Sequence, residues 1–382
     1  MIGSVARAGH GSRAARQRSF LWGGLAAPLL AGLVLATVFP SAWAADNPPA
    51  PAGIAVDGDG NVYVSDYALD RVVKFGPDGS VLGQWGGSGS GPGQLNAPFG
   101  VAVDDHNTLF VVDQLNNRVQ HFAADGSVLG VWGGAGAGAS DLRTPFGVAV
   151  AGGRVYVADF GNDRVQVFAP DGTLLNSLGG RGSGEGQFQR PAGVCVDRDG
   201  TLYVTDHFND RVDRFTVDGR FQAQIGTLEV ASTLTPTSIP TGVATLVAGA
   251  TPMATLNPTQ VATLSASTPA TPQATPPVAA GPASSSTFID PQLRRPEGIT
   301  TDRDGNLWVA DYGRDRVVKL AAADGRLLLS WGSHGSGAGE FLGPKGVAID
   351  PTSGRLYVAD TGNARVQRMS PDGTAEAIWP LP

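Results

Sequence analysis

Short runs of alternating apolar and polar residues, each of strand length, follow one another along most of the chain. Examples are Gly-Val-Ala-Val-Asp at residues 100–104, Arg-Val-Gln-Val-Phe at 164–168 and Leu-Tyr-Val-Thr-Asp at 202–206. Glycine, proline, aspartate and asparagine separate the runs, and these residues favour turns. The period of two and the short length predict β-strands joined by tight hairpins.

The strands recur as six copies of one unit. The tripeptide Pro-x-Gly opens each copy, and its prolines are 47, 47, 46, 105 and 48 residues apart. They are Pro51, Pro98, Pro145, Pro191, Pro296 and Pro344. Four strands in a unit of about 46 residues are typical of a propeller blade. We therefore predict an all-β fold: a six-bladed β-propeller of four-stranded antiparallel blades with one disordered insertion.

The interval of 105 residues contains one unit and an insertion. Residues 227–286 hold 13 threonines and no aromatic residue, and Glu229 is their single charge. Such a segment cannot bury enough apolar surface to offset the entropy of ordering it. We predict blades 1–4 over residues 45–226, a disordered Thr/Pro/Ala-rich insertion over 227–289 and blades 5–6 over 290–382. Its composition resembles O-glycosylated mucin-like stretches, and an unmodified segment fits equally well.

Residues 1–44 have the pattern of a targeting segment. Four arginines stand between residues 7 and 18, residues 20–39 are uncharged and mostly apolar, and Ala42-Trp43-Ala44 fits a small-x-small cleavage site. A signal peptide and an N-terminal membrane anchor both fit, since 20 apolar residues can span a bilayer. In either case we expect an exported protein, secreted or in the cell envelope, whose contact with the membrane is limited to this segment.

Composition and charge exclude several classes of function. The chain has 54 Gly and 27 Pro but only 16% charged residues. Its net charge of −7 would become −11 after loss of the four N-terminal arginines, which argues against nucleic-acid binding because a polyanion would be repelled. One cysteine, Cys195, excludes a disulfide framework and a Cys-rich zinc module, and its place in a first strand predicts a core residue. We expect a monomer.

The repeat separates residues that the blade requires from candidate ligand contacts. In every unit an aspartate ends the second strand and an arginine begins the third. The pairs are Asp66–Arg71, Asp113–Arg118, Asp159–Arg164, Asp206–Arg211, Asp311–Arg316 and Asp360–Arg365. An acid and a base that face each other across a hairpin form a charge-assisted pair. We assign these residues to the structure of the blade rather than to six catalytic sites.

Two positions vary among the units: the residue after the opening proline and the residue after the strand-closing aspartate. In a propeller both lie near the mouth of the central channel, on the face where the blades join. Their aromatic, charged and imidazole residues are Tyr67, Phe99, Phe146, Phe160, His207, Glu297, Tyr312 and Lys345. Aromatic rings with a few polar groups are the usual lining of a ligand site. We predict that these eight residues bind a ligand; ordinary loop residues are the alternative.

The repeated phrases resemble the NHL repeat. The units follow Pro-x-Gly-(Val/Ile)-Ala-Val-Asp, Gly-x-Leu-Tyr-Val-x-Asp, Asn-x-Arg-Val-x-x-Phe and Asp-Gly, and the resemblance covers the chain after residue 44 except the insertion. It implies a six-bladed propeller, here of an exported bacterial type, used mostly for binding. The family includes ubiquitin ligases, RNA-binding regulators, sensor domains of bacterial receptor kinases and the peptidylglycine-amidating lyase. The fold alone does not choose among these functions.

The resemblance to the lyase implies a zinc site with a histidine directly after the opening proline, and no unit has one there. His106, His121, His207 and His334 fall in different parts of the unit, so they do not converge, and we expect no metal and no cofactor. Lactone hydrolysis needs clustered carboxylates, and only Glu297 is well placed. The sequence favours a binding scaffold for a protein, glycan or small ligand; a lactonase-like or amidating-lyase-like enzyme is the alternative.

Overall fold

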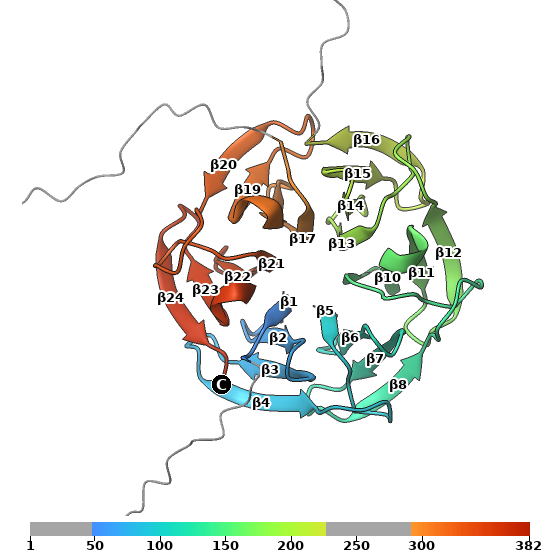
Figure 1. The fold of residues 1–382 in the computed structure, drawn as a ribbon, viewed down its shortest axis with the longest axis horizontal. Coiled ribbons are helices and arrows are strands. Elements are labelled where there is room, and N and C mark those ends of the chain that lie inside the picture. Colours follow the sequence, from blue (N-terminus) through green and yellow to red (C-terminus); the bar gives the residue numbers. More distant parts are fainter. Residues whose placement is uncertain (1–47, 227–291) are drawn as a thin grey trace, which may run out of the picture. The chain divides into compact units, whose positions relative to one another are not determined.

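The computed structural model describes residues 48–226 and 292–382. Within them the chain forms six four-stranded antiparallel sheets around a central channel (Figure 1). In each sheet the strands lie in the order of the sequence, and each sheet is made from one repeat unit. The predicted six-bladed propeller is therefore confirmed. The predicted targeting segment and insertion lie outside the described residues.

The strands of the first three blades are as follows. Blade 1 contains β1 (Pro51–Val56), β2 (Val62–Asp66), β3 (Arg71–Phe75) and β4 (Val81–Gly86). Blade 2 contains β5 (Pro98–Val103), β6 (Leu109–Asp113), β7 (Arg118–Phe122) and β8 (Val128–Trp132). Blade 3 contains β9 (Val148–Ala151), β10 (Arg154–Asp159), β11 (Arg164–Phe168) and β12 (Leu174–Gly179).

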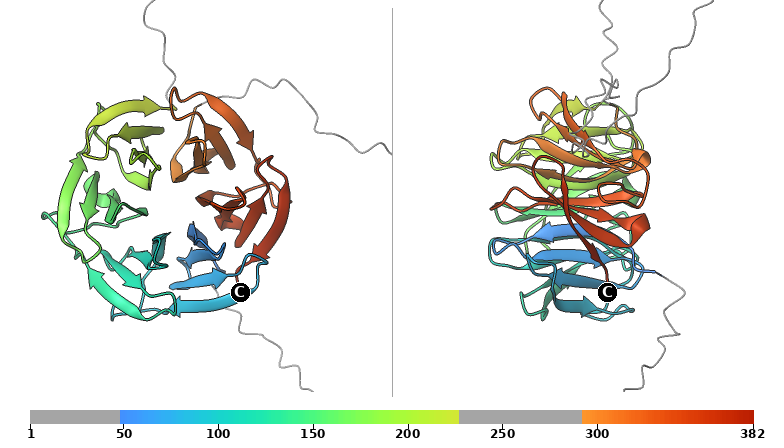
Figure 2. Two further views of the ribbon diagram at one scale, coloured as in Figure 1. Left: turned by 180° about the vertical axis from the view of Figure 1, so that it is seen from behind. Right: turned by 90° about the vertical axis from the view of Figure 1, so that its left-hand side faces the viewer.

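The remaining blades follow the same plan. Blade 4 contains β13 (Pro191–Val196), β14 (Leu202–Asp206), β15 (Arg211–Phe215) and β16 (Phe221–Ile225). Blade 5 contains β17 (Pro296–Thr301), β18 (Leu307–Asp311), β19 (Arg316–Leu320) and β20 (Leu327–Trp331). Blade 6 contains β21 (Pro344–Ile349), β22 (Leu356–Asp360), β23 (Arg365–Met369) and β24 (Ala375–Pro380). The first strand of each blade lines the channel and the fourth forms the outer rim (Figures 1 and 2).

Three short 3-10 helices were not predicted from the sequence. They are η1 (Phe160–Asn162), η2 (Tyr312–Arg314) and η3 (Thr361–Asn363), and each follows the second strand of its blade. The sequence predicted a simple hairpin turn there. Each helix ends after one turn because the next residue adopts a left-handed conformation, as Asp163 does with a φ of 56°.

The core consists of six apolar clusters, one at each junction between neighbouring blades. A large side chain near the end of the fourth strand packs on the glycine of the Asp-Gly hairpin in the next blade. These contacts are Trp85 on Gly126, Trp132 on Gly172, Leu178 on Gly219, Ile225 on Gly325, Trp331 on Gly373 and Trp379 on Gly79. The glycine is needed because any side chain there would collide with the neighbouring blade.

The ring closes by the same contact. Trp379 of blade 6 lies 5.6 Å from the ring of Phe75 in blade 1 and 5.5 Å from Tyr357 in its own blade. No strand is exchanged between blades 1 and 6 in the parts of the chain described. The predicted closure by side-by-side packing of complete blades is confirmed.

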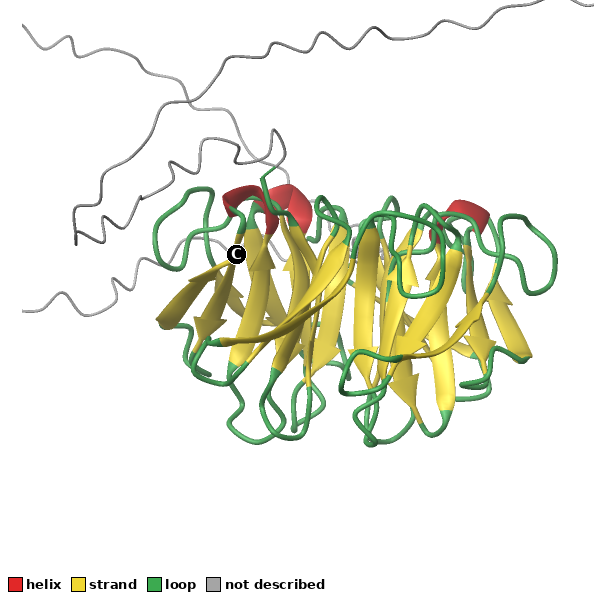
Figure 3. Cartoon of the chain, turned by 90° about the horizontal axis from the view of Figure 1, so that it is seen from below, coloured by secondary structure: helices red, strands yellow, loops and turns green. Residues whose placement is uncertain are grey.

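The propeller has two different faces (Figure 3). The β1–β2 and β3–β4 hairpins and their counterparts lie on one face. The turns between second and third strands, with η1, η2 and η3, lie on the other, together with the loops that join the blades. We call the latter the mouth face. None of the helices in residues 48–226 and 292–382 has the length and apolar character that a membrane crossing requires.

Candidate functional site

The repeated aspartate and arginine residues form ion pairs in all six blades. The distances from Arg Nε to Asp Oδ2, in blade order, are 3.1, 2.6, 2.8, 3.2, 2.7 and 2.6 Å. Every one of these aspartates is fully buried. In blade 2, Asp113 also accepts the N–H of Asn96 at 2.7 Å, and Arg118 donates to the carbonyls of Ser90 and Gly91. These pairs fix the loops between blades and are structural, as predicted.

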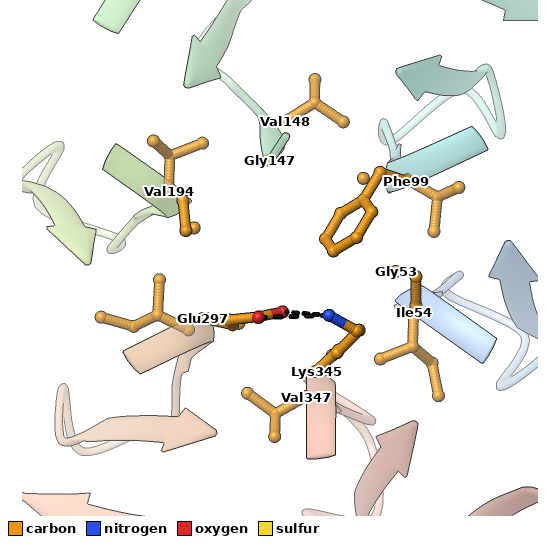
Figure 4. Close-up of a pocket in the computed structure, with 17 residues that line it drawn as sticks. Gly53, Ile54, Phe99, Gly147, Val148, Val194, Glu297, Lys345 and Val347 are labelled. Carbon is orange, nitrogen blue, oxygen red and sulfur yellow. Dashed lines mark hydrogen bonds and ion pairs between the residues drawn. The ribbon is translucent and has the colours of Figure 1, made fainter. Parts of the chain in front are cut away.

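Residues of the first strands line a pocket in the channel (Figure 4). They include Phe99, Glu297 and Lys345, which follow the opening prolines, the glycines of the Pro-x-Gly motif, and the valine or isoleucine residue after each glycine. The cavity volume is about 70 Å³, enough for only a few water molecules. A larger ligand therefore has to bind at the mouth rather than inside the channel.

The glycine of the Pro-x-Gly motif explains why the channel is so narrow. A Cβ atom built on Gly53 would lie 2.2 Å from the carbonyl oxygen of Phe99, and one on Gly147 would lie 2.4 Å from that of Ala192. The same clash occurs at Gly100, Gly193, Gly298 and Gly346. Only glycine permits so close an approach of neighbouring strands. The Pro-x-Gly motif thus sets the width of the channel.

A buried ion pair stands at the mouth. Lys345 Nζ lies 3.2 Å from both carboxylate oxygens of Glu297, which is only 4% exposed (Figure 4). The same ammonium group lies over the rings of Phe99, at 5.2 Å, and Tyr312, at 4.7 Å. Burial raises the pKa of Glu297, and the Lys345 charge opposes this rise. The pair is held in place by cation–π contacts on two sides.

Aromatic rings continue from this pair as an arc over blades 1 to 4. The ring centroids of Tyr67 and Phe99 are 6.4 Å apart, those of Phe99 and Phe146 4.2 Å, and those of Phe146 and Phe160 4.1 Å. His207 lies 6.0 Å beyond Phe160. Together with the Glu297–Lys345–Tyr312 cluster, the arc joins all eight sequence-predicted residues into one set of contacts. We call this set the mouth residues.

His207 is a neutral imidazole at pH 7. It is 8% exposed, and burial, with a further contribution from the positive charges of Lys345 and Arg295, lowers its pKa to about 4. Its Nδ1 lies 3.4 Å from the carbonyl oxygen of Pro296. Because a carbonyl only accepts, Nδ1 carries the proton and Nε2 keeps its lone pair.

A hollow of about 380 Å³ adjoins the mouth between blades 5, 6 and 1. Tyr67, Tyr312 and Lys345 line it, and so do Asp315, Leu342, Gly343, Thr361 and Gly362. Leu342 was not predicted from the sequence because it lies outside the two variable positions of the unit. Its counterparts Asn96, Arg143, Gln189 and Arg294 do vary, so the same comparison applied to every loop position would have found it.

Comparison with known proteins identifies the repeat. Residues 142–168, 188–215, 293–320 and 341–369, which lie in blades 3 to 6, match the NHL repeat. The chain contains four NHL repeats and folds as a six-bladed β-propeller.

Two named proteins are similar to part of this chain in sequence. Peptidyl-glycine alpha-amidating monooxygenase A of Xenopus laevis is 41% identical over 117 residues, which cover 26% of this chain and 12% of that protein. NHL repeat-containing protein 3 of Homo sapiens is 30% identical over 99 residues, which cover 25% of this chain and 28% of that protein. The NHL propeller therefore matches only a minor part of the length of these relatives.

Solved structures share its fold at low sequence identity. A streptogramin B lyase has a TM-score of 0.53 at 13% identity, over 88% of this chain and 84% of that one. A protein of unknown function from Bacteroides thetaiotaomicron also has a TM-score of 0.53, at 16% identity, over 84% of this chain and 69% of that one. These similarities concern the fold.

The described residues of the NHL propeller do not fit a lyase-type zinc site. His106 lies in an exposed turn, His121 stacks on Phe110, and His334 Nδ1 lies 2.9 Å from Asp315 Oδ2. No three His, Cys, Asp or Glu side chains within residues 48–226 and 292–382 converge as metal ligands. Cys195 is buried, and burial raises the pKa of its thiol. It is a core residue, as predicted.

Proposed function

We propose that this NHL propeller is a recognition scaffold that binds a protein, glycan or small ligand through its mouth residues. The convergence of eight side chains at two positions that are not constant among the blades carries this proposal. Residues that every blade needs recur six times, as the Asp–Arg pairs do, whereas no residue type occupies either mouth position in more than two blades. Such variation is expected where a ligand, and not the fold, determines the residue.

The chemistry of the mouth favours binding. Phenylalanine and tyrosine rings supply a large contact area at a low cost in side-chain entropy. Tyr67 is 36% exposed, and Phe99, Phe146 and Phe160 are half-buried, so their rings are accessible on the mouth face. Because the channel beneath these rings is too narrow for a larger ligand, we expect the ligand to lie across the mouth.

The proposal is tested by exchanging aromatic residues at the mouth. A library of glycans and small molecules is screened for ligands that raise the melting temperature of the 382-residue chain. We expect Phe146→Ala and Tyr312→Ala each to weaken binding of a ligand so found at least tenfold at near-normal stability. Leu82→Ala is the matched control, because Leu82 is 55% exposed on the outer strand β4. A ligand that binds both mouth variants and the control equally well would refute a role for the mouth.

An enzyme is the second candidate, and the neutral His207, whose Nδ1 lies 3.4 Å from the carbonyl oxygen of Pro296, favours it. An imidazole with a free Nε2 can act as a general base at neutral pH. The amidating monooxygenases and the streptogramin B lyase, which this chain resembles in part of its sequence or in its fold, are enzymes by name. A panel of lactones and of substrates for lyases, together with elemental analysis, tests this. If a substrate is turned over and Glu297→Gln or His207→Asn abolishes that turnover, an enzymatic function would replace the scaffold proposal.

Export is proposed from the sequence of residues 1–44. The arginines, the apolar run and the Ala42-Trp43-Ala44 site support a location outside the cytoplasm. Mass spectrometry of the protein from the culture medium and the envelope distinguishes a chain that begins at Ala45 from an uncleaved, anchored chain. Recovery of the full chain from the cytoplasm alone would contradict export.

A further inference from the structure

A hollow of about 570 Å³ lies on the mouth face between blades 3 and 4. Its lining consists of Arg143, Gly161, Asp163, Arg181, Gln189, Arg190 and Phe208. Arg143 and Arg190 belong to the segments that lead into blades 3 and 4, and Arg181 belongs to the loop between β12 and β13. We call this site the arginine hollow.

The three guanidinium groups of the arginine hollow have no carboxylate partner. Within residues 48–226 and 292–382, the side chains of Arg143, Arg181 and Arg190 make no hydrogen bond and no ion pair. Asp163 is the one carboxylate in the lining, and its Oδ1 accepts the backbone N–H of Arg190 at 2.9 Å. Arg143 and Arg181 are exposed and Arg190 is partly buried, so the three guanidinium groups around this hollow keep donors available for an anion.

Three other blade junctions show that the fold does not need an arginine at the positions of Arg181 and Arg190, although Arg295 stands at the latter position between blades 4 and 5. The residues at the positions of Arg181 and Arg190 are Ser88 and Ala97 between blades 1 and 2, Ala135 and Thr144 between blades 2 and 3, and His334 and Gly343 between blades 5 and 6. Two of these loop residues bond the aspartate that corresponds to Asp163: Ser88 bonds Asp70, and His334 bonds Asp315 at 2.9 Å. Arg181 makes no such bond to Asp163.

Aromatic surface flanks the arginine hollow. The guanidinium of Arg190 lies 5.3 Å from the ring centroid of Phe160, which belongs to the mouth residues. Phe208 is 47% exposed, and its ring lies 4.8 Å from that of His207. A ligand that occupies the hollow is thus in reach of Phe208, which lines it, and lies near Phe160, which contacts Arg190.

We propose that the arginine hollow binds an oxyanion, a carboxylate, sulfate or phosphate group, carried by a ligand whose ring or apolar part contacts Phe160 and Phe208. Guanidinium groups bind such anions through two parallel hydrogen bonds, and the unpaired arginines concentrate positive charge on a protein whose net charge is −7. The inference rests on the proposed function for the rest of the ligand, since it places the anionic part of that ligand beside the mouth.

The test measures oxyanion binding directly. The 382-residue chain is titrated with sodium sulfate and, separately, with sodium glucuronate at constant ionic strength, and the melting temperature is recorded. We expect a saturable rise with at least one anion. Arg181→Gln should weaken that binding at least fivefold, and the triple variant Arg143→Gln, Arg181→Gln, Arg190→Gln should abolish it. Arg198→Gln is the control, because Arg198 is exposed in the β13–β14 turn on the opposite face.

Either of two results overturns the inference: no saturable effect of either anion, or unchanged binding by the triple variant. A response to sulfate alone favours tetrahedral anions, and a response to glucuronate alone favours a carboxylate on a sugar; both support the site. The proposed function fails separately. If anions bind the hollow but no library ligand depends on Phe146 or Tyr312, the oxyanion site stands and the role of the mouth is wrong.

Discussion

Asp213 occupies a buried position where three sister blades have a glutamine and the other two, at Val73 and Val318, have a valine. At the same position Gln120 donates to Asp113 Oδ2 at 3.1 Å and to the carbonyl of Gln94 at 2.6 Å. Gln166 and Gln367 form the same two bonds. Asp213 instead shares the guanidinium of Arg211 with Asp206, at 3.2 Å from each carboxylate. Burial raises the pKa of Asp213 to about 7, and the Asp206 charge adds to this rise while Arg211 opposes it.

We predict that Asp213→Gln stabilises the protein at pH 8 by about 1–2 kcal/mol. Since the folded state binds the Asp213 proton more tightly than the unfolded state, wild-type stability should fall as the pH rises from about 4 to 7. The glutamine variant should lose this part of the slope. Urea unfolding at pH 5 and pH 8 measures both effects. A variant that is less stable than the wild type at pH 8 would show that the carboxylate is favourable.

The hairpin pairs lead to a second prediction at the residue scale. Arg164→Gln leaves the fully buried Asp159 carboxylate without its charged partner, which lies at 2.8 Å. We expect a loss of about 2–4 kcal/mol in the free energy of unfolding, with ligand binding at the mouth unchanged. The exposed Arg198→Gln serves as control in the same urea titration. A loss no larger than that of the control would contradict a structural role for the pair.

Among the elements, the loops between blades have a common length. In four junctions, eight residues lie between a glycine at or directly after the end of the fourth strand and a buried leucine or phenylalanine. These eight-residue loops are residues 87–94, 134–141, 180–187 and 333–340. Gly226 and Leu293 occupy the two flanking positions between blades 4 and 5, and Leu293 is 3% exposed. Arg316 donates to the carbonyl of Gln292 at 2.7 Å, as Arg211 donates to that of Gln187.

We therefore predict that the eight residues 180–187 can replace residues 227–292. Both flanking contacts and the acceptor carbonyl for Arg316 would be reproduced, so the melting temperature should stay within a few degrees of the wild-type value. Calorimetry of both proteins measures this. A fall of ten degrees or more would mean that the replaced segment contributes packing of its own.

The features of the fold that could be predicted from the sequence are those that recur in, or vary among, the six repeat units. Strand positions, the Asp–Arg pairs and the gathering of the mouth residues follow from a period of about 47 residues and the fixed geometry of a blade. The 3-10 turns were missed because all six turns end in a left-handed residue and only three of them form a 3-10 helix. The arginine hollow was missed because Arg143 and Arg181 are close only through the folded loops, and no local pattern links them.

In the whole molecule, the ring closes where an apolar cluster that includes Trp379 joins blades 6 and 1. Trp379 is 7% exposed and packs against Phe75 and Gly79 across the junction of blades 6 and 1. We predict that Trp379→Ala costs about 3–5 kcal/mol, because it leaves a cavity at the junction that no exchanged strand supports. The neighbouring Ile378, 40% exposed, provides the control Ile378→Ala. Equal melting temperatures for the two variants would contradict closure by packing.

The most direct test of the central claim, recognition at the mouth face, is the hydrogen exchange of backbone amides with and without a ligand found by the library screen. We predict slower exchange at the mouth-face turns, residues 67–70, 160–163 and 312–315. The opposite-face hairpins at 57–60 and 78–80 should be unchanged. Slower exchange confined to those hairpins or to the outer strands would contradict the account.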